Sequence, residues 1–292
     1  MDRSTLQLLY PFEPHFAYLD GPRMHYVDEG SGPTTALLLH GNPTWSFFYR
    51  ELIPGLREGG RVLAPDHIGC GLSEKPRTYA YTLETHIRNL TEFVERLRLP
   101  AVDLVVHDWG GPIGFGWATR HPERVRRLVV LNSAAWLGER APWRIRICRS
   151  SLIGNFAVRR LNLFTRAAVR MAVAKRRLPR AVREGYLAPY DSYAHRIAIL
   201  RFVQDIPVDP TIPSHRVLQE IEANLPRLAD KPMLICWGMR DFCFRPHFLD
   251  GWLERFPRAQ VHRFADAGHY LLEDAHDEVV PLIRRFLSSS TP

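Results

Sequence analysis

The order of hydrophobic patterns along the chain predicts an α/β fold, with a mostly parallel sheet of eight strands flanked by helices. Short apolar runs alternate with longer segments of helical periodicity, as in parallel sheets whose strands are joined by helical crossovers. Nearly every position of these runs is apolar, which is typical of strands buried on both faces. Between residues 133 and 226 only helical patterns occur, so we expect a helical cap inserted between two strands.

The individual elements follow from local patterns. Runs at 16–19 and 23–27, separated by an Asp-Gly turn, predict an antiparallel hairpin that begins the sheet. The clearest helix is expected at 83–99, where apolar residues spaced three or four apart share one face. In the cap, the patterns favour helices at 162–174 and 192–203. Six further strands are expected at 36–40, 62–65, 102–107, 128–131, 233–237 and 261–265.

These patterns divide the chain into two parts. We expect one core formed by residues 1–132 and 227–292, with the cap at 133–226. The 292 residues are 46% hydrophobic and 24% charged, which argues against a disordered, collagen-like or coiled-coil chain.

Two features bear on the compartment. No apolar run reaches the roughly 18 residues that span a bilayer, and residues 1–16 lack the uninterrupted apolar stretch of a signal peptide. The cysteines have no spacing typical of a zinc site, and core packing is the simplest role for them. We therefore expect a cytoplasmic protein with reduced thiols and no metal site. The four cysteines are Cys70, Cys148, Cys236 and Cys243.

The net charge of +8 is concentrated in one segment. From Glu139 to Glu184 there are thirteen basic and two acidic residues, a local charge of +11, so the rest of the chain sums to −3. A uniformly basic nucleic-acid-binding protein would not be built this way, and we expect no nucleic-acid partner. Arginines here alternate with apolar residues, which fits either a solvated face or a surface that meets a membrane or a protein partner. They are Arg144, Arg146, Arg149, Arg159, Arg160, Arg166, Arg170, Arg176 and Arg177.

The most specific motif is the segment VVHDWGGP at residues 105–112. A buried strand ends there, and glycines follow before a helix begins. Such a sharp turn strains the backbone of its apex residue and presents that side chain above the edge of the sheet. The apex is Asp108, a candidate nucleophile, although Asp108 alone fits the N-cap of the following helix equally well.

Three other segments place polar residues within a few positions after strands. The strand at 36–40 ends in His-Gly-Asn-Pro, Asp241 follows the strand at 233–237, and His269 follows the last strand. Open α/β sheets form their sites at the carboxyl ends of strands, and the chain order nucleophile, acid, histidine is that of nucleophile-elbow enzymes. Each residue alone fits a surface or capping role, whereas together they indicate a catalytic triad.

From about residue 10 to residue 288, these motifs make the sequence resemble an α/β-hydrolase of the haloalkane dehalogenase family. The resemblance implies Asp108 as nucleophile, His269 as base and Asp241 as the acid that orients the histidine. It also implies that Asn42 and Trp109 bind the leaving halide. No carboxylate directly follows the strand before the cap, so the acid falls on Asp241, as in the third dehalogenase subfamily.

The residue types suit displacement at a saturated carbon. A carboxylate with an ordinary pKa near ~4 is already charged at neutral pH and attacks without a base. Attack by Asp108 forms an alkyl ester, which water activated by His269 then hydrolyses, while N–H groups of Asn42 and Trp109 stabilise the developing oxyanion. The expected function is therefore cleavage of carbon–halogen bonds through a covalent ester, with water and a small hydrophobic substrate and without a cofactor.

Three other functions stay open. Parts of the cap resemble β-lactone decarboxylases of bacterial olefin biosynthesis, which make long-chain alkenes and share the same catalytic residues. An epoxide hydrolase needs acidic tyrosines in the cap, for which Tyr186, Tyr190 and Tyr193 are available, but Asn42 argues against that activity. A non-catalytic binding protein of this fold is less favoured, because all three residues of the triad are present. The cap segments that carry the decarboxylase resemblance are 166–172, 187–191 and 196–207.

The cap is expected to cover the strand ends and to line the pocket. Core packing within the cap is the simpler role for most of its apolar side chains, and self-association of the chain stays open. The candidates for the pocket wall are Trp136, Phe156, Phe164, Met171, Ile197 and Phe202.

Overall fold

A computed structural model, which describes residues 3–138 and 147–289, contains a single eight-stranded sheet. The strand order is β1-β2-β4-β3-β5-β6-β7-β8. β2 runs antiparallel to its neighbours β1 and β4, and all other neighbouring strands are parallel. The strands are β1 (His15–Tyr18), β2 (Arg23–Glu29), β3 (Thr35–Leu39), β4 (Arg61–Pro65), β5 (Val102–His107), β6 (Val125–Leu131), β7 (Met233–Gly238) and β8 (Gln260–Phe264).

The central strands are buried on both faces. Leu37 and Leu39 of β3 pack into the core on one side of the sheet, and Leu38 packs into the core on the other. In β5, Leu104 and Val105 face opposite sides in the same way. This double burial explains why these strands are continuous apolar runs, and it confirms the α/β fold predicted from them.

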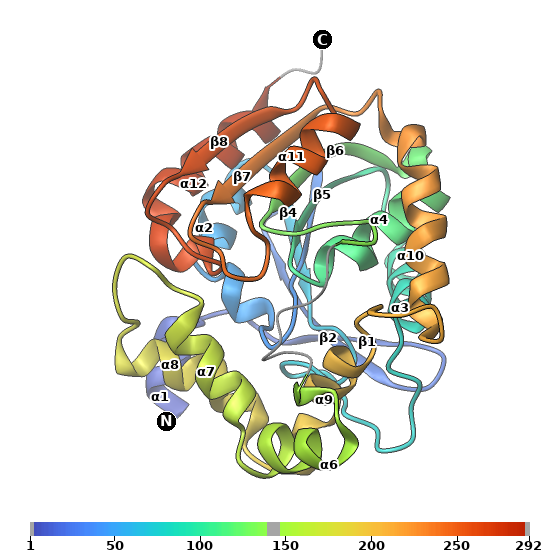
Figure 1. The fold of residues 1–292 in the computed structure, drawn as a ribbon. Helices are drawn as coiled ribbons and strands as arrows, with labels where there is room; N and C mark the ends of the chain where they lie inside the picture. Colours follow the sequence, from blue (N-terminus) through green and yellow to red (C-terminus); the bar gives the residue numbers. More distant parts are fainter. Residues whose placement is uncertain (1–2, 139–146, 290–292) are drawn as a thin grey trace.

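Helices cover both faces of the sheet (Figure 1). One core contains apolar side chains of α3 (Leu83–Arg96), α4 (Gly110–Arg120), α10 (Pro213–Asn224) and α11 (Pro246–Arg255). The opposite core contains those of α2, α12 and the 3₁₀ helix η1. The remaining bounds outside the cap are α1 (Arg3–Leu9), η1 (Ser46–Tyr49), α2 (Leu52–Arg57), η2 (Pro122–Arg124) and α12 (Leu271–Ser288).

The helix predicted at 83–99 is α3, which ends three residues earlier, at Arg96. The side-chain oxygen of Thr82 accepts a hydrogen bond from the backbone N–H of Thr85 and so caps the start of α3. Near its end, Arg98 adopts a φ of +48°, a left-handed conformation that stops the helix.

Helices fill the long connection between β6 and β7. The described residues between these two strands include no strand, and in Figure 1 most of these helices lie together at the lower end of the molecule. α10 instead packs against α3 and α4 of the core. The limits of the cap at residues 133 and 226 therefore stay a prediction. The elements are α6 (Ser151–Gly154), a π-helical segment η3 (Asn155–Arg160), α7 (Leu163–Met171), α8 (Arg180–Leu187), η4 (Ala188–Tyr190), η5 (Ala194–Arg196), α9 (Ile197–Gln204), α10 and η6 (Leu225–Leu228).

Two global features bear on the compartment and the thiols. Within the described ranges, every helix is too short or too polar to cross a bilayer. All four cysteines are free thiols, two of them buried and two partly exposed.

Candidate active site

Asp108 lies at the turn between β5 and α4, with a φ of +50° in the left-handed region that non-glycine residues rarely adopt. The Ser133 hydroxyl donates a hydrogen bond of 2.6 Å to the Asp108 carbonyl oxygen and so holds the turn. The adjacent loop approaches so closely that a Cβ at Gly41 would overlap the Asp108 carboxylate. This geometry is the strand-to-helix elbow that the sequence predicts at this position.

Two backbone N–H groups bind the Asp108 carboxylate. The N–H of Asn42 donates to Oδ1 at 2.6 Å, and the N–H of Trp109 also donates to the carboxylate. Burial raises the pKa of Asp108 above its usual value, although the His269 charge and the two N–H groups act in the opposite direction. The Asn42 N–H is placed to stabilise negative charge on Oδ1 once the other oxygen carries a covalent bond, and the Trp109 N–H acts on the same carboxylate.

His269 faces both carboxylates. Its Nε2 lies 3.6 Å from Asp108 Oδ2, and its Nδ1 lies 2.7 Å from Asp241 Oδ2. The other oxygen of Asp241 accepts hydrogen bonds from the backbone N–H groups of Cys243 (2.6 Å) and Phe244 (3.0 Å), so its orientation is fixed. Nδ1 therefore carries a proton toward Asp241, and Nε2 is left facing Asp108.

Burial disfavours the charged imidazole of His269 and by itself would lower its pKa. The charge and hydrogen bond of Asp241, together with the charge of Asp108, outweigh burial, so the pKa of His269 is raised. An imidazole of this kind accepts a proton from water and is stabilised as a cation afterwards. The structure thus brings together the three residues that the sequence assigns to the triad, from the ends of three strands.

The Asn42 and Trp109 side chains line the same cavity as Asp108. The Asn42 side-chain nitrogen donates one hydrogen bond, of 3.3 Å, to the carbonyl oxygen of Ile199, which leaves its second hydrogen for a ligand. The Trp109 indole packs against Phe202 at 5.3 Å between ring centroids. Among the described residues, the indole N–H has no hydrogen-bond partner, so it is available as a donor to an anion in the cavity.

The cavity has a volume of about 600 Å³ and is mostly apolar. α7 of the cap and the loops after β7 and β8 form much of its wall, above the strand ends. A site of this size, with few polar groups at one end, is typical of a small-molecule pocket. The lining residues are Asn42, Pro43, Asp108, Trp109, Cys148, Ala157, Leu163, Phe164, Ala167, Ala168, Met171, Ala172, Val203, Ile206, Phe242, Cys243, Arg245, His269 and Tyr270.

The cap differs from the sequence-based expectation in part. Phe164 and Met171 line the cavity as expected, whereas Phe156 is 62% exposed and points away from the core. The three other candidates are buried in the core on one face of the sheet instead. Helical periodicity identifies these side chains as buried, but it does not identify the surface against which they pack. The three are Trp136, Ile197 and Phe202.

The cap tyrosines do not form the acid pair of an epoxide hydrolase. The Tyr186 hydroxyl donates to the Glu273 carboxylate, the Tyr190 hydroxyl donates to the Thr44 carbonyl oxygen, and Tyr193 is exposed. None of the three lines the cavity.

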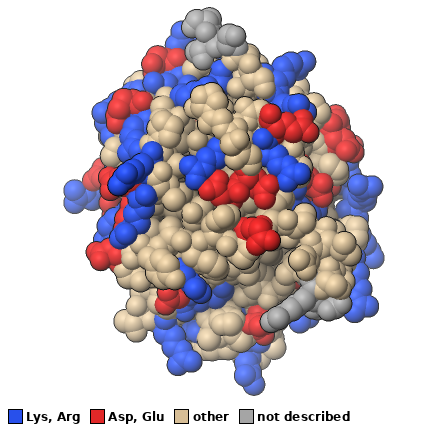
Figure 2. All heavy atoms as spheres, turned by 180° about the vertical axis from the view of Figure 1, so that it is seen from behind, with Lys and Arg blue, Asp and Glu red and all other residues tan. Residues whose placement is uncertain are grey.

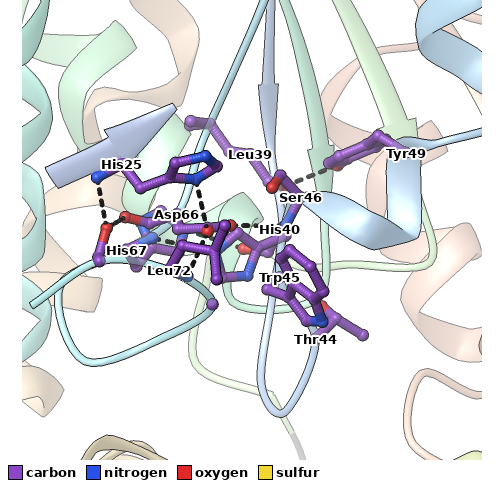
Figure 3. Close-up of polar contacts among 12 residues, drawn as sticks. His25, Leu39, His40, Thr44, Trp45, Ser46, Tyr49, Asp66, His67 and Leu72 are labelled. Atoms are coloured by element: carbon purple, nitrogen blue, oxygen red, sulfur yellow. Dashed lines mark hydrogen bonds and ion pairs between the residues drawn. The ribbon is translucent and has the colours of Figure 1, made fainter. Parts of the chain in front are cut away.

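The loop that carries Asn42 is held by a buried polar network around Asp66 (Figure 3). Asp66 is fully buried and accepts hydrogen bonds from His25 Nδ1 (2.8 Å) and from the backbone N–H groups of Ser46 (2.7 Å) and Leu72 (2.8 Å). Burial alone would raise the pKa of Asp66, but His25 and the other donors outweigh it and lower the pKa. Asp66 therefore stays charged and fixes the start of η1.

His40 links this network to the loop (Figure 3). Its Nε2 accepts a hydrogen bond of 3.0 Å from the His67 backbone N–H, and its Nδ1 donates to the Gly41 carbonyl oxygen at 2.8 Å. Burial lowers the pKa of His40, which agrees with a neutral ring. The Gly41 carbonyl belongs to the same peptide group as the Asn42 N–H, so His40 orients the donor that binds Asp108.

The sequence patterns considered above did not assign this role to Asp66 and His40. Asp66 directly follows β4, as Asp108 follows β5, so the rule that selects polar residues at strand ends also selects Asp66.

Comparisons with known proteins decide the family. Residues 36–276 match the alpha/beta hydrolase fold family. A cis-3-alkyl-4-alkyloxetan-2-one decarboxylase of Shewanella oneidensis is 45% identical over 291 residues, which cover 98% of this chain and 91% of that protein. Haloalkane dehalogenase 2 of Mycobacterium tuberculosis is 36% identical over 282 residues, which cover 95% of this chain and 96% of the relative. The chain belongs to the haloalkane dehalogenase family of α/β-hydrolases.

Solved structures of the family support this. The crystal structure of haloalkane dehalogenase DatA from Agrobacterium tumefaciens matches with a TM-score of 0.86 at 26% identity, and the match covers 94% of this chain and 96% of DatA. The resemblance, the fold class and the assignment as an enzyme are therefore confirmed. The names of these relatives refer to haloalkanes and dialkyl oxetanones, which are small hydrophobic molecules. Substrates of that class agree with the apolar cavity of this chain.

Proposed function

We propose that this α/β-hydrolase converts a cis-3-alkyl-4-alkyloxetan-2-one, a β-lactone with two alkyl substituents, into an alkene and carbon dioxide. The observation that carries the proposal is the Asp108 carboxylate, bound by two backbone N–H groups and facing an apolar cavity of about 600 Å³. The 45% identity to a decarboxylase of this substrate class, against 36% to a dehalogenase, supports this substrate over a haloalkane.

The first step opens the ring. Because Oδ1 of Asp108 is bound by the Asn42 N–H, Oδ2 is the attacking oxygen. It attacks ring carbon C4 from the side opposite the ring oxygen, the C4–O bond breaks, and the ring oxygen becomes part of a free carboxylate. The Trp109 indole and the Asn42 amide donate hydrogen bonds to this carboxylate, and no proton is transferred.

The second step releases both products. The bond between C3 and the carboxylate breaks, its electron pair forms the C3=C4 double bond, and the ester oxygen of Asp108 leaves C4. Carbon dioxide and an alkene are formed and the Asp108 carboxylate is restored, so no water is consumed. The ester oxygen is already anti to the carboxylate because attack occurred opposite the ring oxygen. The two alkyl groups stay on the same side, and a cis lactone yields a cis alkene.

A synthetic cis-3,4-dialkyl β-lactone tests the proposal. We expect the wild-type protein to release a cis alkene and carbon dioxide in equal amounts, measured by gas chromatography with mass detection. Asp108→Asn keeps the shape of the site but lacks the nucleophile, so it serves as the control for spontaneous loss of carbon dioxide. A β-hydroxy acid, a trans alkene or full activity of Asp108→Asn would contradict the proposed route.

Carbon–halogen cleavage is the second candidate function. The Trp109 indole N–H lacks a partner among the described residues and lines the cavity with the Asn42 amide, so the site can bind a halide as it leaves. Asp108 would form an alkyl ester with release of halide, and water deprotonated by His269 would then cleave the ester to an alcohol. Release of bromide from a bromoalkane, measured beside the lactone assay, ranks the two activities.

A further inference from the structure

Exposed large apolar side chains are concentrated on the cap. In the described parts of the chain there are twelve, and seven of them lie between residues 147 and 171. Leu152 is 85% exposed and Phe156 is 62% exposed, both within the α6–η3 segment. A large apolar patch on a soluble surface usually marks a site of interaction. The seven residues are Ile147, Leu152, Ile153, Phe156, Leu161, Leu163 and Met171.

The same part of the chain contains no acidic residue. Residues 147–183 include ten lysines and arginines and neither aspartate nor glutamate. On α7, Arg166 and Arg170 are exposed, and within the described residues neither forms an ion pair. Figure 2, in contrast, shows basic and acidic side chains next to one another over the upper part of the molecule. Two of the arginines named above for the basic segment, Arg144 and Arg146, lie outside the described residues.

The apolar patch continues into the cavity. Leu163 and Met171 of α7 are 50% and 43% exposed, and both also line the cavity beside the catalytic residues. Ala167, between them on the same face, lines the cavity as well. Molecules that contact the patch are therefore next to an apolar route toward Asp108.

We propose that this surface docks on a bilayer with anionic headgroups. The cap patch is defined as the seven exposed apolar residues together with Arg166 and Arg170. Interfacial segments of membrane-bound proteins combine Leu and Phe, which enter the boundary of the acyl chains, with arginines that contact the phosphates. A continuous negative surface also matches a basic segment without acids, because an anionic leaflet attracts each lysine and arginine that lies near it.

Docking places the cavity beside the lipid phase. A dialkyl lactone is itself lipophilic and partitions into the bilayer, from which it would enter between Leu163 and Met171. This delivery step rests on the proposed function, whereas the docking itself does not.

Co-sedimentation with vesicles tests the docking at low ionic strength. One set of vesicles contains phosphatidylcholine alone, and the other contains equal parts of phosphatidylcholine and phosphatidylglycerol. We expect the wild-type protein to bind the second set and to bind the first at least ten-fold more weakly. Since each basic residue at an anionic surface contributes about a five-fold gain in binding, Arg166→Gln with Arg170→Gln should weaken binding about 30-fold.

Two comparisons of variants distinguish binding through the cap patch from binding through charged or apolar residues elsewhere on the surface. Arg258→Gln with Arg263→Gln removes the same charge near β8, which Figure 1 places at the opposite end of the molecule from α7. Its binding should stay within two-fold of wild type. Leu152→Ser with Phe156→Ser should weaken binding at least ten-fold, whereas Tyr18→Ser, at an exposed position of β1, should not.

The outcomes distinguish docking from activity. Equal binding by the patch variants and wild type, or no binding to either vesicle, overturns the docking proposal. Self-association that Leu152→Ser with Phe156→Ser abolishes, without vesicle binding, assigns the patch to a second copy of the chain and also overturns it. Vesicle binding without alkene formation in either vesicles or detergent leaves docking intact and refutes the proposed function.

Discussion

Replacing His269 with glutamine separates the two reactions that this site can perform. Hydrolysis of an alkyl ester on Asp108 needs a base for water, and the His269 Nε2, 3.6 Å from Asp108 Oδ2, is the base in reach. General base catalysis contributes about 10²–10⁴-fold to a rate, so the hydrolytic step should slow by at least about 100-fold, or about 2.7 kcal/mol. Alkene formation from a lactone transfers no proton and should slow by less than about ten-fold.

The assay compares one bromoalkane that the wild type hydrolyses with one cis β-lactone. With the bromoalkane, His269→Gln should release about one bromide per site and stop, and its intact mass should rise by one alkyl group in place of a proton. With the lactone, the variant should keep producing alkene without a stable adduct. The double variant Asp108→Asn with His269→Gln controls for alkylation elsewhere and should show no mass increase.

Two results would refute this reasoning. One is an unmodified His269→Gln protein after exposure to a bromoalkane that the wild type turns over, because the ester would then not be an intermediate. The other is an equal loss of both activities, because His269 would then take part in a step that the two reactions share.

Three further predictions concern the surroundings of the triad. Trp109→Phe keeps an aromatic ring but removes the indole N–H. Loss of one hydrogen bond to an anion, worth about 1.5–3 kcal/mol, should lower kcat/KM about 10- to 100-fold while the protein stays folded. An unchanged kcat/KM would exclude the indole as a donor. Because the pKa of His269 is raised, bromoalkane hydrolysis should be lost on acidification at a pH above ~6.5, the ordinary histidine pKa. Asp241→Asn should move this loss to lower pH in a pH–rate profile. An unchanged profile would contradict the pairing of His269 with Asp241. Folding lowers the pKa of Asp66, so its charge stabilises the protein above pH ~4, and this contribution is lost as pH falls through the lowered pKa. Asp66→Asn should therefore reduce the free energy of unfolding, measured with urea, by about 3 kcal/mol at pH 7 and by much less near pH 3.

Much of the fold is predictable from the sequence because its signals are local. Four of the six residues at 102–107 are apolar, and Asp108, Trp109 and two glycines follow. β5 spans that range (Val102–His107). A short, mostly apolar run of this kind is typical of a strand in a parallel sheet that is buried on both faces. The position of Asp108, Asp241 and His269 after three strands follows from the same runs, since parallel strands end at one edge of the sheet.

The pocket wall is less predictable. Phe156 and Phe164 lie in the same helical part of the cap and are chemically identical, yet Phe156 is exposed and Phe164 lines the cavity. Periodicity gives the face of a helix on which a residue lies, whereas the helix that covers this face depends on contacts between segments far apart in the chain.

The sequence by itself determined the order of the strands along the chain, the elbow and the residue types at the strand ends, because backbone preference and hydrophobic spacing act within a few residues. Only the tertiary structure decided that the Asn42 and Trp109 N–H groups meet the Asp108 carboxylate, that Asp66 and His40 hold the Asn42 loop, and that the exposed apolar residues of the cap continue into the cavity. These contacts join residues that are distant in sequence, and their distances are set by how the whole chain packs.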